Sequence, residues 1–176
     1  MIAVTAAAVV GVAARATVLV TVEEAVKMAF PAAVTERQTL FLSDSQREHA
    51  GREIGASVSS SIVTRFEARA DDGSVIGWAY LDTHRVRTLP ETLLIVVDGS
   101  GSVQRVEVVT FREPLEYMPK QGWYEQYRGK ELDDNLALKR DIRPVTGATL
   151  TASATTEAVR RVLAIHRAVT GGDSPS

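Results

Sequence analysis

The chain has 176 residues, a length typical of one domain, and 45% of them are hydrophobic, which is enough to form a core. Its 20 Lys and Arg against 22 Asp and Glu give a formal net charge of -2, without the cationic excess that nucleic-acid-binding proteins need. Because the chain has no cysteine, disulfides, thiolate metal centres, cysteine-ligated iron–sulfur clusters and a cysteine nucleophile are excluded. Its three histidines, His49, His84 and His166, do not have the spacing of metal ligands.

Residues 1–16 are predicted to be a signal peptide or a membrane anchor. Met1–Ala14 has no charged residue, and Ala14-Arg15-Ala16 fits the small-x-small pattern of a secretory cleavage site. No basic residue precedes this apolar run, and Arg15 interrupts any window long enough to span a membrane, so a buried helix or strand is the alternative. We expect a folded domain over residues 17–170 and a flexible tail over residues 171–176.

Two capping boxes predict two helices in the first third of the chain. In each box a Ser or Thr is followed three residues later by Glu or Gln, at Thr21–Glu24 and at Ser43–Gln46. Apolar residues recur at helical spacing after the first box until Pro31 ends that helix. The second helix is expected to end near Gly55.

The middle of the chain is predicted to form two β-hairpins. Ser61–Asp82 contains two strand-like runs separated by the turn Asp71–Ser74, and Thr92–Val97 and Val103–Phe111 form a second pair across an Asp-Gly-Ser-Gly turn. The apolar run at residues 93–97 is continuous, which indicates a strand covered on both faces. Short connections favour antiparallel pairing, so we predict an α+β domain with an antiparallel sheet of hairpins covered by helices.

A short motif, Thr146-Gly147-Ala148-Thr149, comes directly before the predicted last helix. That helix has an apolar face made of Val159, Val162, Leu163, His166 and Val169. We expect Thr151 or Ser153 to cap its start. Free backbone N–H groups and the positive end of the helix dipole suit a phosphate there, although a plain capped turn is the alternative. The glycine pattern matches neither a nucleotide P-loop nor a dinucleotide fingerprint.

Residues Thr146–Thr151 resemble the flavinylation motif Ser/Thr-Gly-Ala-Thr of the FMN-binding domain family. That family includes the C subunit of the sodium-pumping NADH:quinone oxidoreductase, the G subunit of the Rnf complex and NosR-type regulators. In the family, a flavin transferase of the ApbE family joins the FMN phosphate to the last threonine of the motif as a phosphoester. The resemblance therefore implies that Thr149 is the acceptor of covalent FMN.

Weaker similarity extends upstream of the motif, over about residues 61–169. Gln126–Lys130 resembles the family's Gln-Phe-x-Gly-Lys segment, Trp123 stands where an aromatic residue commonly precedes it, and Glu113 with the following proline falls where members carry Glu-Thr-Pro-Gly-Leu-Gly. Members usually have an acidic residue three positions before the motif, where this chain has Arg143; Asp141 is the nearest acidic residue before it.

The resemblance implies no catalytic residue and no metal ligand, and it implies eight cofactor-binding residues: Thr149, Thr146, Gly147, Ala148, Leu150, Thr151, Glu113 and Lys130. The cations His84, Arg85 and Arg87 are further candidates, because they could stabilise an anionic reduced flavin or contact a redox partner; a solvated strand end is the alternative. Five aromatic residues are candidates for stacking on the flavin or for the core: Trp78, Trp123, Tyr117, Tyr124 and Tyr127.

The predicted function is that of an electron-transfer flavoprotein domain, a subunit of an oxidoreductase rather than a self-contained enzyme. Its expected partners are the flavin transferase and the quinone, iron–sulfur or cytochrome subunits of a membrane redox complex, and no nucleic acid. The N-terminal segment indicates the outer, periplasmic face of the cytoplasmic membrane. The alternatives are an accessory subunit without flavin and a protein that binds FMN reversibly. The sequence has no Ser-His-Asp arrangement that would support a hydrolase.

Overall fold

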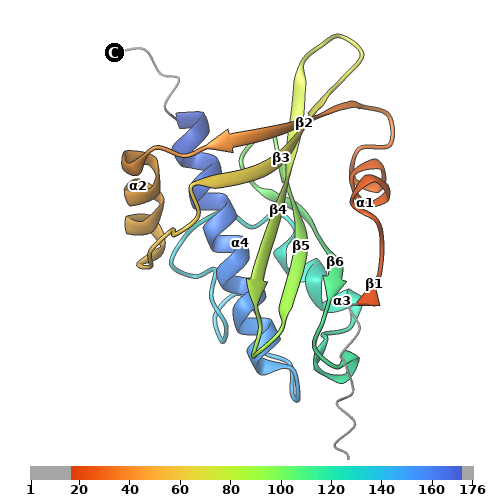
Figure 1. Ribbon diagram of the computed structural model, residues 1–176, viewed down its shortest axis with the longest axis vertical. Helices are drawn as coiled ribbons and strands as arrows, with labels where there is room; N and C mark the ends of the chain where they lie inside the picture. Colours follow the sequence, from red (N-terminus) through yellow and green to blue (C-terminus); the bar gives the residue numbers. More distant parts are fainter. Residues whose placement is uncertain (1–16, 172–176) are drawn as a thin grey trace, which may run out of the picture.

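The structure, a computed structural model, describes residues 17–171 (Figure 1). The predicted signal or anchor segment and residues 172–176 of the predicted tail lie outside the described residues. Strands pair antiparallel in one sheet with the order β1-β6-β5-β4-β3-β2. Its strands are β1 (Thr17–Val18), β2 (Val34–Phe41), β3 (Ile62–Arg69), β4 (Val75–Arg85), β5 (Pro90–Asp98) and β6 (Val103–Phe111).

Helices cover both faces of this sheet. They are α1 (Val22–Ala29), α2 (Asp44–Ile54), α3 (Gln121–Tyr124) and α4 (Thr149–Thr170), and two 3₁₀ turns, η1 (Leu115–Tyr117) and η2 (Glu125–Tyr127), flank α3. Figure 1 shows α2 and α4 on one side of the sheet and α1 on the other. Both predicted capping boxes are present, and α2 ends at Gly55 in the left-handed region, at φ 67°.

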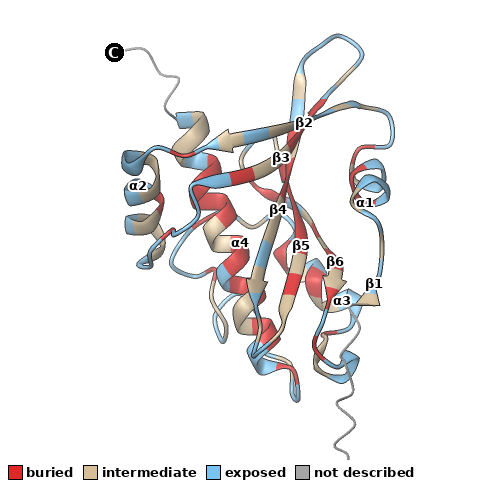
Figure 2. Cartoon of the chain, viewed as in Figure 1, coloured by how far each residue is buried: buried red, intermediate tan, exposed pale blue. Residues whose placement is uncertain are grey.

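Two clusters of buried residues hold these layers together (Figure 2). In β5, Leu93 and Ile95 face α4 in the larger cluster, whereas Leu94 and Val96 face α1 in the smaller one. This alternation confirms that the apolar run is buried on both faces, because successive side chains of a strand point to opposite sides. The predicted α+β class with an antiparallel sheet of hairpins covered by helices is confirmed.

Strand β2 was not predicted, and its sequence explains why. It lies at the edge of the sheet and pairs with β3 alone, and most of its side chains are exposed. An edge strand of this kind needs no apolar alternation, since its stability comes from backbone pairing with its neighbour.

The motif and the end of the β4–β5 hairpin lie at the same end of the molecule. Figure 1 shows the N-terminus of α4 close to this hairpin end and to the η1 turn. Segments separated by about sixty residues of sequence therefore meet around the start of α4.

Candidate functional site

The motif turns the chain sharply into α4. Gly147 has a φ of 83°, in the left-handed region that glycine adopts without strain. Ala148 is the N-cap residue and supplies no side-chain hydrogen bond, and its own N–H donates to the carbonyl oxygen of Val145 at 3.2 Å. Thr149 is the first helical residue and is exposed, with its hydroxyl donating to the same carbonyl at 3.2 Å.

The start of α4 differs from the prediction in one respect: neither Thr151 nor Ser153 caps it. The helix begins earlier, at Thr149, so both residues lie inside it. The Thr151 hydroxyl donates to the carbonyl oxygen of Tyr117 at 2.6 Å, and the Ser153 hydroxyl donates to Glu157 at 3.1 Å. The N–H groups of the first turn are consequently left without a side-chain acceptor, which is the arrangement that binds an anion at a helix N-terminus.

A cavity of about 230 Å³ adjoins this turn. It is lined by Gly147–Thr151 and by Arg87 and Tyr117. The Arg87 guanidinium carbon lies 4.9 Å from the centroid of the Tyr117 ring. Pockets that enclose a complete small ligand are commonly about 300 to 1,000 Å³. This cavity therefore fits the phosphate end of a nucleotide rather than a whole cofactor.

Glu113 fixes the loop that carries Arg87. Its Oε1 accepts hydrogen bonds from the backbone N–H groups of Arg87 (3.3 Å), Thr88 (2.8 Å) and Leu89 (2.9 Å). Burial would raise the pKa of Glu113, but these N–H donors outweigh it and hold the pKa below its usual range. Glu113 thus acts as a carboxylate that anchors the β4–β5 turn beside the cavity.

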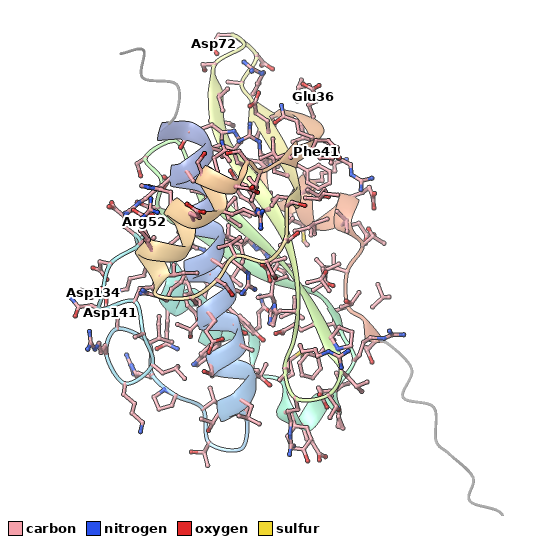
Figure 3. The ribbon with its side chains drawn as sticks, turned by 60° about the vertical axis from the view of Figure 1, so that its left-hand side comes forward. Glu36, Phe41, Arg52, Asp72, Asp134 and Asp141 are labelled. Carbon is pink, nitrogen blue, oxygen red and sulfur yellow. The ribbon has the colours of Figure 1, made fainter. Side chains whose placement is uncertain are left out.

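The segment before the motif is held by the residues that resemble the family's upstream pattern. The indole Nε1 of Trp123 donates to the carbonyl oxygen of Arg143 at 2.7 Å, and the N–H of Arg143 donates to Oε1 of Gln126 at 3.0 Å. Lys130 does not line the motif cavity; its Nζ pairs with Oδ2 of Asp141 at 2.7 Å. Figure 3 shows Asp141 in the loop that leads to α4. These contacts position the chain as it enters the motif.

Of the five aromatic candidates, Tyr117 is the one that lines the cavity. Tyr124 and Tyr127 are buried in the core, and Trp78 packs against the His166 ring with 4.8 Å between centroids. His166 itself is buried on the apolar face of α4, as predicted. Tyr117 and Arg87 are separate candidates in the sequence, and nothing in the sequence indicates that they lie side by side.

The three cations near the β4–β5 hairpin end, His84, Arg85 and Arg87, have different surroundings in the structure. His84 lies between two carboxylates, with Nδ1 2.9 Å from Oδ1 of Asp82 and Nε2 3.1 Å from Oε2 of Glu91. Arg85 donates to the carbonyl oxygen of Thr88 at 2.7 Å. The remaining member of the cluster, Arg87, is the cation that reaches the motif.

Within residues 17–171, no group of three or more acidic or histidine side chains has an arrangement that could hold a metal ion. No helix in this range is long and apolar enough to cross a membrane.

One of three comparisons with known proteins gives a match. No curated protein and no solved structure matches the chain. The family model described as FMN-binding domain matches residues 89–164, a range that runs from the end of the Arg87 loop through β5 and β6 into α4 and includes the motif and Glu113. The uncapped helix start, its small residues and the neighbouring cation fit the phosphate of FMN. Residues 89–164 therefore resemble the FMN-binding domain family, and this match supports FMN binding at the motif.

Proposed function

We propose that Thr149 carries FMN as a phosphoester and that the domain relays electrons for a membrane-associated redox complex. The observation that carries this proposal is the exposed hydroxyl of Thr149 at the first residue of an uncapped helix, in a cavity shared with Arg87. A phosphate attached there would lie against the N–H groups of the first helical turn.

Among the threonines of the motif region, the contacts favour Thr149 as the acceptor. Thr151 is 1% exposed and its hydroxyl is engaged by Tyr117, so a transferase has no access to it. Thr146 is exposed but precedes the turn at Gly147, outside the helix. Thr149 combines an accessible hydroxyl with the positive end of the helix dipole.

With FMN attached at Thr149, the cofactor would carry the electrons and the protein would hold it in place. Bound FMN takes up two electrons and can pass them on one at a time, which connects two-electron donors with one-electron carriers. The chain's own residues hold the phosphate end, and Tyr117 and Leu150 provide apolar surface beside it. A covalent link prevents loss of the cofactor, which suits an extracytoplasmic site where free FMN is scarce.

The proposed partners are a flavin transferase of the ApbE family and the quinone, iron–sulfur or cytochrome subunits of the complex. The apolar segment 1–16 supports a position at the outer face of the cytoplasmic membrane.

The test uses the full chain produced together with a flavin transferase. We expect a yellow protein whose mass exceeds that of the sequence by FMN less water. Thr149→Ala should abolish this increment, and the matched variant Thr39→Ala, at an exposed threonine of the edge strand β2, should keep it. Flavin that is released on unfolding would instead identify a reversible FMN-binding protein, and a colourless chain of unchanged mass would identify an accessory subunit without flavin; either result refutes the covalent proposal.

A further inference from the structure

Arg87 is a cation without an ionic partner at the edge of the motif cavity. Its side chain is exposed and stacks over Tyr117, and within residues 17–171 it forms no ion pair. Most other arginines near the sheet have a carboxylate or a carbonyl oxygen as partner, such as Arg161 with Asp82 and Arg85 with Thr88. The charge of Arg87 is thus available to a bound anion.

The backbone around Arg87 is held in place from outside its own hairpin. The β4–β5 turn closes through the N–H of Val86, which donates to the carbonyl oxygen of Leu89 at 3.1 Å. A single carboxylate oxygen of Glu113 then accepts hydrogen bonds from three successive N–H groups of this turn. Glu113 is only 8% exposed. A buried acceptor used three times fixes the loop more firmly than the short turn alone would.

We propose that Arg87 pairs with the negative charge of the flavin nucleotide and that Glu113 is a positioning residue that holds Arg87 at the cavity. The proposal rests on FMN being bound at the motif. The negative charge has two sources: the phosphate group at Thr149, and the flavin ring once two electrons and one proton from a chemical reductant have converted it to an anion. Both offer the same chemistry to a guanidinium.

Glu113 acts on the bound flavin only indirectly, through Arg87. Its carboxylate faces the turn's N–H groups, and through them it sets where Arg87 projects. A change at Glu113 therefore affects the flavin only as long as Arg87 is present. This dependence separates a positioning role from a general contribution to stability.

The first arm of the test measures free ligands binding to the full chain produced without a flavin transferase. Fluorescence titration with FMN and with riboflavin, which lacks the phosphate, compares the wild type with Arg87→Gln and Arg87→Lys. If Arg87 contacts the phosphate, Arg87→Gln should weaken FMN binding about tenfold, the scale of a charge-assisted hydrogen bond, and leave riboflavin binding unchanged. Arg87→Lys should lose less, since it keeps the charge.

The second arm measures the midpoint potential of the flavin-loaded full chain. If Arg87 contacts the reduced ring, Arg87→Gln should weaken binding of the anionic form about tenfold relative to the oxidised form, which is a potential lower by about 30 mV for a two-electron couple. Arg112→Gln, at an exposed arginine outside the cavity, is the control for overall charge. Glu113→Gln should change whichever of the two quantities Arg87→Gln changes, the FMN affinity or the midpoint potential, and in the same direction. In the Arg87→Gln background, Glu113→Gln should have no further effect on that quantity.

Arg87→Gln with wild-type FMN affinity and wild-type potential would overturn the proposal, and Arg87→Gln alone suffices if Glu113→Gln does not fold. An additive effect of Glu113→Gln would refute its positioning role. Failure of the covalent link at Thr149 is a separate result, because the titration with free FMN does not depend on it.

Discussion

Replacing His84 by Gln tests how the hairpin that carries Arg87 is joined to α4. His84 lies between Asp82 and Glu91, and Arg161 of α4 binds Asp82 through two hydrogen bonds of 2.9 and 2.7 Å. Glu91 is fully buried, and the hydroxyl of Thr155 on α4 is 3.5 Å from its Oε2. Both ring nitrogens of His84 can donate to these carboxylates only when the imidazole is protonated.

The size of the effect follows from the pKa of His84. Burial alone would lower this pKa, but hydrogen bonds and the charges of Asp82 and Glu91 raise it from 6.5 to about 9. A difference of this size between the unfolded and folded chain corresponds to about 3 kcal/mol of stability. Because the folded pKa is the higher one, the stabilisation is fully present below pH 6.5 and is lost as the pH rises through about 9.

The assay is urea unfolding of the full chain, produced without the flavin transferase, across this pH range. The free energy of unfolding of the wild type should fall by about 3 kcal/mol between pH 6.5 and about pH 9. His84→Gln should start lower and stay nearly level, so that the two proteins converge as the pH rises. His49→Gln, on the exposed side of α2, should follow the wild type. An equally steep decline in His84→Gln would refute the reasoning.

Three further changes probe other parts of the fold. Burial lowers the pKa of His166 from 6.5 to about 4, so the free energy of unfolding of the wild type should fall by about 3 kcal/mol as the pH drops from 6.5 toward 4. Urea unfolding of His166→Gln should not show that decline. Gly147→Ala places a side chain at φ 83° and should lower the free energy of unfolding, measured by thermal denaturation, by about 1 to 2 kcal/mol. Gly122→Ala, at a residue without positive φ, should not cause this loss, and equal losses in the two variants would contradict backbone strain as the cause. Tyr127→Phe removes a buried 2.8 Å hydrogen bond to Thr156 and should lower denaturant stability by about 1 kcal/mol; an unchanged midpoint would show that the bond contributes nothing.

Local signals in the sequence were sufficient for most of the fold. Capping boxes located α1 and α2, and Gly-containing turns located both hairpins, because each of these features depends on residues close together in the chain. The continuous apolar run of β5 also predicted helices on both faces of the sheet. Strand β2 has no comparable local signal, because its stability comes from backbone pairing with β3.

The contact between Glu113 and the loop that carries Arg87 depends on the register of β5 and β6, which the sequence does not reveal. Val97 pairs with Val103 next to the β5–β6 turn, but two register shifts follow along the hairpin, so that Glu91 pairs with Phe111. Continuing that register places Leu89 opposite Glu113, which is where its hydrogen bond is observed. Without the two bulges, residue 111 would face Leu89, and residue 113 would face Arg87 inside the turn.

Arg143 stands where members of the FMN-binding domain family usually have an acidic residue, and backbone contacts explain why it leaves the motif intact. The backbone of Arg143 is held by Trp123 on one side and Gln126 on the other, and its side chain is exposed. The path into Gly147 therefore does not depend on the charge at this position. The nearest acidic residue, Asp141, is paired with Lys130. Arg143 thus changes the surface that the proposed transferase would meet, while backbone contacts hold the segment that leads to Thr149 at the start of α4.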